Sequence, residues 1–196
     1  LNSLSHQPDR DFEVIIVDDG SIINLRPTAE LFHESLTIEF FRKDNSGPGL
    51  SRNYGARRAK NDWLVFVDSD VIVETDYIQN IKKNICEIPC DAFGGADKAH
   101  KGFNLMQKAI SYSMTSVFTT GGIRGNKKAV TKFQPRSFNM GVRKSAFEKV
   151  AGFSEMRIGE DPDLSMRLWE NGFTTAFFDD IGVYHKRRVD FGKFSK

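Results

Sequence analysis

Two uninterrupted apolar runs, each followed by paired aspartates, dominate the hydrophobic pattern of this chain. The run Trp63-Leu64-Val65-Phe66-Val67 stops at Asp68-Ser69-Asp70. The run Glu13-Val14-Ile15-Ile16-Val17 stops at Asp18-Asp19. Short continuous runs rich in β-branched and aromatic residues predict strands buried on both faces. Because ligands of open α/β sheets bind beyond the carboxyl ends of such strands, the pattern predicts a parallel sheet with a shared functional edge.

The rest of the chain alternates between helical and strand-like segments, as expected of an α/β domain. Further strands are predicted over 37–41, 91–96, 174–178 and 182–184. Helices are predicted over 27–35, 74–85, 103–117 and 144–150, after the Gly47-Pro48-Gly49 junction, and from Asp161 to Gly172. Asp161 precedes Pro162, which predicts Asp161 as the N-cap of the last helix.

The carboxylates of Asp68 and Asp70 follow one strand and are separated by a single small residue. Two carboxylates so close repel each other unless a cation lies beside them, and hard divalent ions prefer oxygen ligands. The pair therefore suggests Mg²⁺ or Mn²⁺ with a diphosphate on the other side of the ion. A solvated turn after the strand is the simpler alternative.

The glycines and proline at 45–55 form a strand-to-helix junction that can present backbone N–H groups and a positive helix end to an anion. Arg52, early in the following helix, would then reach a phosphate or a base. A helix start also needs Gly and Pro for geometric reasons, so this segment alone leaves both interpretations open.

The Glu160-Asp161 pair has two interpretations as well. Capping of the helix explains Asp161. A carboxylate fixed at a helix start is also a well-placed general base, and the neighbouring acid Glu160 keeps its pKa from falling far.

Basic residues gather in two segments. Between Gly121 and Phe147 there is no acidic residue. One interpretation is a solvated basic face. The other is a Gly-hinged basic loop over 119–136 that closes over an anionic donor or acceptor. After His185, basic residues alternate with Phe191 and Phe194, a pattern compatible with contact with an anionic membrane surface.

Length and composition then limit the class of protein. The 196 residues, 39% hydrophobic and 28% charged, suffice for one domain with its own core. A net charge of +2 gives no reason to invoke nucleic acid. No apolar run approaches the ~18 residues of a membrane span. Cys86 and Cys90 alone make neither a disulfide framework nor a zinc site. Together these observations predict a cytoplasmic protein with reduced thiols. A start without Met and an end inside a basic segment predict a piece trimmed at both ends.

Five motifs in order carry a resemblance to a known family. They are Phe-Glu-Val-Ile-Ile-Val-Asp-Asp-Gly-Ser at 12–21, Gly-Leu-Ser-Arg-Asn-Tyr-Gly at 49–55, Trp-Leu-Val-Phe-Val-Asp-Ser-Asp at 63–70, Phe-Asn-Met-Gly-Val-Arg-Lys-Ser-Ala-Phe at 138–147 and Gly-Glu-Asp-Pro-Asp-Leu-Ser-Met-Arg-Leu at 159–168. Each is weak alone, but the ordered set resembles the family 2 glycosyltransferases of the GT-A fold over nearly the whole chain. The resemblance implies a single catalytic domain over 1–196 with a doubly wound, mixed α/β sheet.

The resemblance also implies a donor site for a nucleotide-sugar. Asp19, or else Asp18, matches the acid that binds the donor base. Arg52 and Asn53 match positions beside the nucleotide, and Asp68 matches a residue near the donor ribose.

The metal and the chemistry follow from the same resemblance. Asp70, together with Asp68, matches the ligands of a divalent metal, Mn²⁺ or Mg²⁺, bound to the diphosphate. His185 resembles a late histidine that approaches this metal in some GT-A enzymes. Asp161 of the Glu160-Asp161 motif matches the general base of an inverting single displacement.

The Gly121-Gly122-Ile123-Arg124 stretch and the basic tail resemble members that make bacterial polysaccharides. The acceptor implied is a hydroxyl of a growing glycan or of a lipid-linked glycan, at the inner face of the cytoplasmic membrane.

One departure from the family leaves alternatives open. Family members begin with an apolar strand that forms one wall of the nucleotide pocket, and nothing before Leu1 supplies it. The sheet is therefore expected to lack its first central strand, and a catalytically inactive glycan- or nucleotide-binding module of the same fold is the alternative function. A phosphotransferase or phosphatase with Asp68 as nucleophile is a further alternative, but such enzymes want Thr or Val where this chain has Ile72, and they leave Glu160-Asp161 unexplained.

Overall fold

A computed structural model of the chain describes residues 1–98, 132–156 and 158–185. The helix predicted over 103–117, the basic loop 119–136 up to residue 131, and the tail after His185 lie outside these residues. Within the described part, no helix has the length and apolar character that crossing a bilayer requires.

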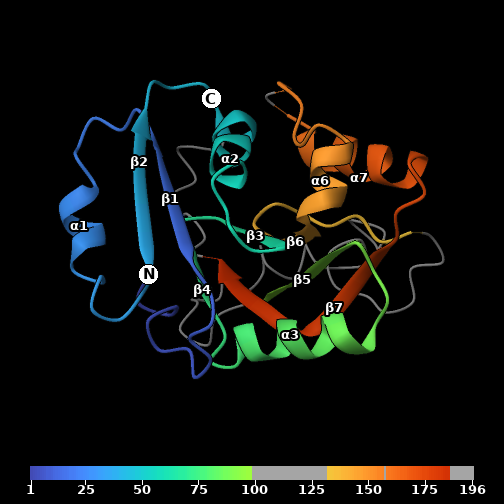
Figure 1. The fold of residues 1–196 in the computed structure, drawn as a ribbon, viewed down its shortest axis with the longest axis horizontal. Coiled ribbons are helices and arrows are strands. Elements are labelled where there is room, and N and C mark those ends of the chain that lie inside the picture. The colour runs from blue at the N-terminus through green and yellow to red at the C-terminus, as the bar shows by residue number, and fades with distance from the viewer. Residues whose placement is uncertain (99–131, 157, 186–196) are drawn as a thin grey trace, which may run out of the picture.

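The strands form two separate sheets, as Figure 1 shows. In the smaller sheet, β1 (Val14–Asp19) and β2 (Ile38–Lys43) pair in parallel. The larger sheet has the strand order β3-β6-β5-β7-β4, with one parallel pair, β5 and β7, among antiparallel ones. Its strands are β3 (Trp63–Val67), β4 (Val71–Val73), β5 (Ala92–Lys98), β6 (Asn139–Arg143) and β7 (Thr175–His185).

The division between the sheets falls between β1 and β3, and each of these strands pairs on one edge alone within the described residues. The beginnings of the two strands are nevertheless joined. The Glu13 carboxylate, just before β1, accepts hydrogen bonds from the backbone N–H groups of Lys60 (2.7 Å) and Asn61 (3.2 Å), just before β3. Within residues 1–98, 132–156 and 158–185, no strand pairs with both β1 and β3.

Helices cover the sheets from three directions (Figure 1). Helices α6 and α7 pack with α2 over one face of the larger sheet, around buried residues that include Leu64, Met140 and Leu168. Helix α3 covers the opposite face, around Tyr77, Phe93 and Phe178. The bounds are α1 (Arg26–Glu30), α2 (Pro48–Ala56), α3 (Tyr77–Glu87), α6 (Lys144–Lys149) and α7 (Glu160–Glu170).

The element pattern differs from the sequence prediction in several places. Helix α1 ends at Glu30 instead of Ser35, because the next residues form tighter turns in which each N–H bonds three residues back, as in Ser35 to Phe32 (3.0 Å). The two late strands over 174–178 and 182–184 are one strand, β7. Strands β4 and β6 were not predicted, because three residues are too few for a pattern and Asn139-Met140-Gly141 lacks strand formers. Strand β3 was expected to be buried on both faces, but only its Leu64 is fully buried.

Gln7 fastens the N-terminal segment to the start of α3. Its side chain is 1% exposed. The amide nitrogen donates to the carbonyl oxygens of Ser3 (3.0 Å) and Glu74 (2.7 Å), and the amide oxygen accepts from the backbone N–H of Ile78 (3.1 Å) in the first turn of α3. A glutamine distant in sequence thus satisfies a helix N–H that no local side chain caps.

We expect Gln7→Ala to lower the free energy of unfolding by about 1–3 kcal/mol, because the buried Ile78 N–H and two part-buried carbonyl oxygens would lose their partner. Urea denaturation followed by circular dichroism measures this value. The matched control is Gln79→Ala, which removes an exposed glutamine from α3 itself and should change stability little. Equal midpoints for the two variants would contradict the fastening role.

Candidate functional site

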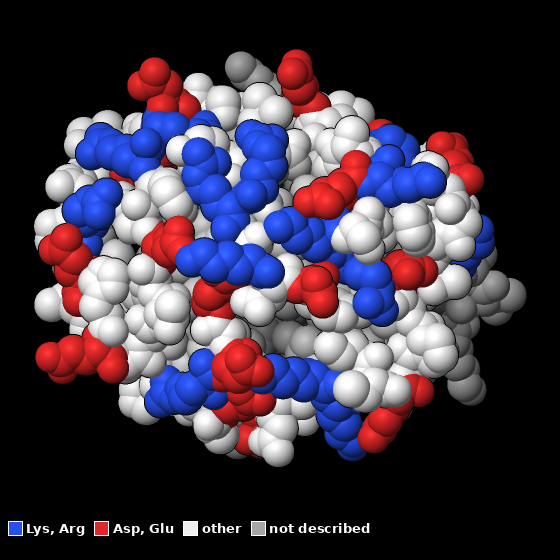
Figure 2. All heavy atoms as spheres, viewed as in Figure 1, with Lys and Arg blue, Asp and Glu red and all other residues white. Residues whose placement is uncertain are grey.

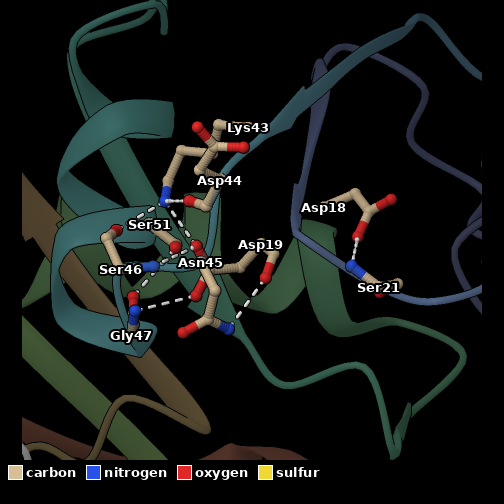
Figure 3. A network of polar contacts seen from close by, with 9 residues as sticks. All are labelled: Asp18, Asp19, Ser21, Lys43, Asp44, Asn45, Ser46, Gly47 and Ser51. Carbon is tan, nitrogen blue, oxygen red and sulfur yellow. Dashed lines mark hydrogen bonds and ion pairs between the residues drawn. The ribbon is translucent and has the colours of Figure 1, made fainter.

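The corner between β1 and α2 is held by Asp19 (Figure 3). Its two carboxylate oxygens accept the backbone N–H groups of Ser46 (2.9 Å) and Gly47 (2.8 Å), and the Lys43 ammonium donates to the same carboxylate. Burial raises the pKa of Asp19, but hydrogen bonds from Lys43, Ser46 and Gly47 outweigh it and hold the pKa at about 2. The anion at the positive end of α2 is therefore the protein's own carboxylate, and the N–H groups predicted to face a phosphate are occupied by it.

Asp18 points away from Asp19, as neighbouring side chains on a strand do (Figure 3). Its residue is 2% exposed. One oxygen accepts the Ser21 backbone N–H (2.9 Å), and hydrogen bonding by Ser21 lowers the pKa of Asp18. The other oxygen, Oδ2, lies 3.6 Å from Arg42 Nε and has no hydrogen-bond partner within the described residues. Of the two acids, Asp18 is the one that keeps an unused acceptor.

Arg52 joins the end of β3 to the start of α7. One nitrogen of its guanidinium lies 2.9 Å from Asp68 Oδ1, and another lies 3.3 Å from Glu160 Oε1. The guanidinium also stacks on the Phe153 ring, 5.5 Å from its centroid. Residues that are far apart in the sequence therefore meet around one cation, as the motif order predicts for a shared site.

The basic side chains of this region lie on one face. Figure 2 shows Lys and Arg gathered over β2 and α2, the elements that carry Arg42, Lys43 and Arg52. Each of these three side chains is also paired with an acid, namely Asp18, Asp19, and Asp68 with Glu160.

Asn53 binds the backbone of a distant segment. Its side chain is buried, donates to the Phe153 carbonyl oxygen (2.7 Å) and accepts from the Phe153 N–H (2.9 Å). Because both ends of the amide are used, Asn53 holds α2 against the segment before α7. Its predicted place beside the donor nucleotide stays a prediction.

The predicted metal ligands Asp68 and Asp70 follow β3, in the turn that leads into β4. Asp68 is half-buried and Asp70 is exposed. The backbone of His185 pairs with Val71, one residue after Asp70. The described residues contain no cluster of three His, Cys, Asp or Glu side chains close enough to hold an ion. Metal binding by these residues therefore stays a prediction.

Helix α7 begins two residues earlier than the Asp-Pro signal indicates. Its N-cap is Gly159 in the left-handed conformation, with φ of 91°, and Glu160 is the first helical residue. The prediction of Asp161 as N-cap is therefore wrong, because Gly159 supplies the reversal that ends the preceding segment. Asp161 lies inside the first turn instead.

The Asp161 carboxylate is held in a largely dry place. Burial raises its pKa, and hydrogen bonding by the backbone and side chain of Ser137 offsets part of this rise. Ser137 is 4% exposed, and the Asp161 atom Oδ1 is buried without a hydrogen-bond partner within the described residues. A carboxylate with a raised pKa and an unused oxygen is suited to accept a proton.

Several residues that shape this site were not found from the sequence. They are Arg42 beside Asp18, Lys43 beside Asp19, Ser137 beside Asp161 and Phe153 beneath Arg52. No motif marks them, because their roles depend on contacts between segments far apart in the chain. Only Lys43, two residues before the Gly-Pro junction segment, carried a positional hint.

Comparison with known families agrees with this geometry. A family model described as "Glycosyl transferase family 2" matches residues 1–151. The chain is 31% identical over 192 residues to poly(ribitol-phosphate) beta-N-acetylglucosaminyltransferase TarS of Staphylococcus aureus, covering 94% of this chain and 32% of that protein. It is 28% identical over 182 residues to an uncharacterized glycosyltransferase of Haemophilus influenzae, covering 90% and 58%. The chain spans between 10% and 58% of the length of the first curated relatives it matches.

Solved structures share the fold. The crystal structure of S. aureus TarS in complex with UDP superposes with a TM-score of 0.71 at 25% identity, covering 93% of this chain and 54% of that one. The mannosyltransferase PcManGT of Pyrobaculum calidifontis, in complex with GDP-Man and Mn²⁺, gives 0.72 at 16% identity, covering 97% and 52%. These likenesses confirm the predicted mixed α/β GT-A fold.

Proposed function

The chain belongs to glycosyl transferase family 2, and from this premise we propose that it transfers a sugar from a nucleotide-sugar to an acceptor hydroxyl with inversion. The observation that carries the proposal is the bridge of Arg52 between Asp68 and Glu160. Through the Arg52 side chain, Asp68, which is assigned to the donor, is linked to Glu160, which precedes the assigned base Asp161.

In the proposed reaction, Asp161 takes the proton of the acceptor hydroxyl. The acceptor oxygen then forms a bond to the anomeric carbon as the bond from that carbon to the diphosphate oxygen breaks. The raised pKa of Asp161 brings its proton affinity closer to that of a working base than an exposed aspartate would have. Arg52 lies beside it as a positive charge for the leaving diphosphate.

Asp70, Asp68 and His185 would hold the divalent metal. When bound, such an ion neutralises the charge that develops on the leaving nucleoside diphosphate. Arg52 competes with it for Asp68, so we expect the pair between Arg52 and Asp68 to weaken when metal is present.

Asp18 is our choice for the acid that binds the donor base, in place of Asp19. The free acceptor Oδ2 of Asp18 suits the ring N–H of uracil or guanine, whereas both oxygens of Asp19 are bound by the protein. The bound nucleotides of the structural neighbours, UDP for TarS and GDP-Man for PcManGT, make a uridine or guanosine diphosphate sugar the donor class to test.

The acceptor class follows from the family and its relatives. TarS is named for transfer of N-acetylglucosamine to poly(ribitol-phosphate), and we propose a bacterial cell-surface glycan or polyol phosphate as the acceptor here. A lipid-linked acceptor at the membrane and contact through the basic tail remain part of this proposal.

The experiment is a calorimetric titration of UDP, and then of GDP, with and without Mn²⁺. For wild type we expect binding that depends on the metal. Asp70→Ala should weaken it about tenfold or more, because a first ligand of the ion is lost. The matched control is Asp76→Ala, an exposed acid at the start of α3 whose side chain makes no capping bond; it should bind as wild type does.

The second candidate, an inactive glycan- or nucleotide-binding module, is favoured by the division of the sheet between β1 and β3. The same titrations separate the transferase from a module that binds glycan alone, and release of nucleoside diphosphate in the presence of acceptor separates it from an inactive module that binds nucleotide. Absence of binding by either nucleotide, with or without Mn²⁺, would sink the transferase proposal for these 196 residues.

A further inference from the structure

Four basic residues of the acid-free segment between Gly121 and Phe147 lie in the described part of the chain. Three of them have partners, namely Lys132 over the Trp169 ring (5.5 Å), Arg143 beside Asp91 (3.9 Å) and Lys144 with the Ala59 carbonyl oxygen (2.6 Å). These three side chains are explained by the packing of the domain.

Arg136 is different. Its Nε is buried and has no hydrogen-bond partner within the described residues. A guanidinium N–H removed from water without an acceptor is costly, so such groups usually have a partner in the functional state. Packing among the described residues, 1–98, 132–156 and 158–185, does not supply that partner.

The place of Arg136 suggests what the partner is. The next residue, Ser137, provides the hydrogen bonding that faces Asp161, and the Asp161 atom Oδ1 is also buried without a partner. The unused donor therefore belongs to the residue next to the one that hydrogen-bonds Asp161, whose own Oδ1 is an unused acceptor. A ligand that carries both an oxyanion and a hydroxyl would satisfy both atoms.

We propose that Arg136 binds an oxyanion, a phosphate or a carboxylate, that the acceptor carries near the hydroxyl to be glycosylated. This inference rests on the proposed function, with Asp161 as the base. The planar guanidinium fork matches the two oxygens of such a group. The donor diphosphate is a poorer match for Arg136, because the donor side already has Arg52 beside Asp68.

The test measures acceptor binding by NMR titration to protein saturated with UDP and Mn²⁺. The probes are two pairs that differ in charge, ribitol 5-phosphate with ribitol, and methyl glucuronide with methyl glucoside. For wild type we expect the charged member of at least one pair to bind tenfold or more tightly than the neutral one. Arg136→Gln should abolish this preference and leave UDP affinity unchanged, and Arg136→Lys should retain part of it.

Arg143→Gln is the matched control, because it removes another arginine of the same segment whose partner is known. It should keep the preference for charge. Equal binding of both members of each pair by wild type, no binding of any probe, or a preference that survives in Arg136→Gln would overturn the inference. A loss of UDP affinity in Arg136→Gln would overturn it too and assign Arg136 to the donor. Failure of the proposed function itself is recognised separately, by wild-type protein that does not bind nucleotide at all.

Discussion

Asp161→Asn is expected to lower the rate of glycosyl transfer by about 10²–10⁴-fold, the usual contribution of a general base. Asparagine keeps the shape of the side chain but cannot take the acceptor proton. Donor affinity should stay within about twofold of wild type, because nothing in the structure places the Asp161 carboxylate on the donor side of Arg52. The measurement is release of nucleoside diphosphate in the presence of acceptor, with calorimetry for the donor.

The same substitution should leave the protein as stable as wild type or more stable at pH 7. Burial raises the pKa of Asp161 in the folded state, so folding favours its protonated form. A group with a raised pKa stabilises the folded protein at pH values below the pKa that it has in the unfolded chain. This stabilisation is lost as the pH rises through the pKa that the group has in the folded protein. At neutral pH the ionised carboxylate therefore costs stability, and asparagine removes that cost.

The pH dependence of the reaction rate also follows from the raised pKa of Asp161. Because the base works only when it is ionised, kcat should fall as the pH drops through the raised pKa of Asp161. The fall should occur at a higher pH than an exposed aspartate would produce. A profile that stays flat down to the ordinary range of aspartate would contradict the assignment.

Asp163→Asn is the matched control, two residues along the same turn of α7. Asp163 accepts two bonds from Arg167 (2.6 and 3.0 Å), and these lower its pKa. The ionised Asp163 stabilises the folded protein at pH values above the pKa that it has in the unfolded chain, and this stabilisation is lost as the pH falls. We therefore expect Asp163→Asn to lower the free energy of unfolding by about 0.5 kcal/mol at pH 7 and to keep its activity. If Asp161→Asn is the less stable and Asp163→Asn the less active variant, the roles given to the two acids are reversed.

The sequence predicts much of this site because its acids follow strand and helix ends that the hydrophobic pattern locates. Asp68 and Asp70 are found after β3, and Asp18 and Asp19 are the last two residues of β1, as the apolar runs indicate. Strand order and partners do not follow from those runs. Strand β3 pairs with β6, a strand contributed by residues 139–143, whose pattern shows no strand at all.

The functions of neighbouring residues were harder to assign for a related reason. A motif identifies Asp18-Asp19 and Arg52-Asn53 as pairs, but within each pair the two side chains make different contacts. Asp19 caps α2 and Asn53 binds the Phe153 backbone. Which member serves the fold depends on the segment that packs beside it, and the local sequence does not contain that segment.

Gly141→Ala is expected to lower the free energy of unfolding by about 3 kcal/mol or more, because a single methyl group would overlap the Phe93 ring. Phe93 is fully buried, and its ring stacks on Phe178 (4.6 Å between centroids) and lies against Trp63 (5.5 Å). The ring therefore has no space to retreat into. Urea denaturation measures the loss.

The expected damage extends to the site, because Gly141 lies in β6 opposite Val65 of β3, the strand that ends before Asp68. Gly55→Ala is the control. Its added Cβ would lie 3.3 Å from Val17 Cγ2, a contact that needs only a small adjustment, and alanine favours the helix by about 1 kcal/mol over glycine. That variant should be as stable as wild type or slightly more so. If Gly141→Ala unfolds at the same urea concentration as Gly55→Ala, the Phe93 ring can move aside for the added methyl group. The close contact between Gly141 and this ring would then not be what holds β6 to β5.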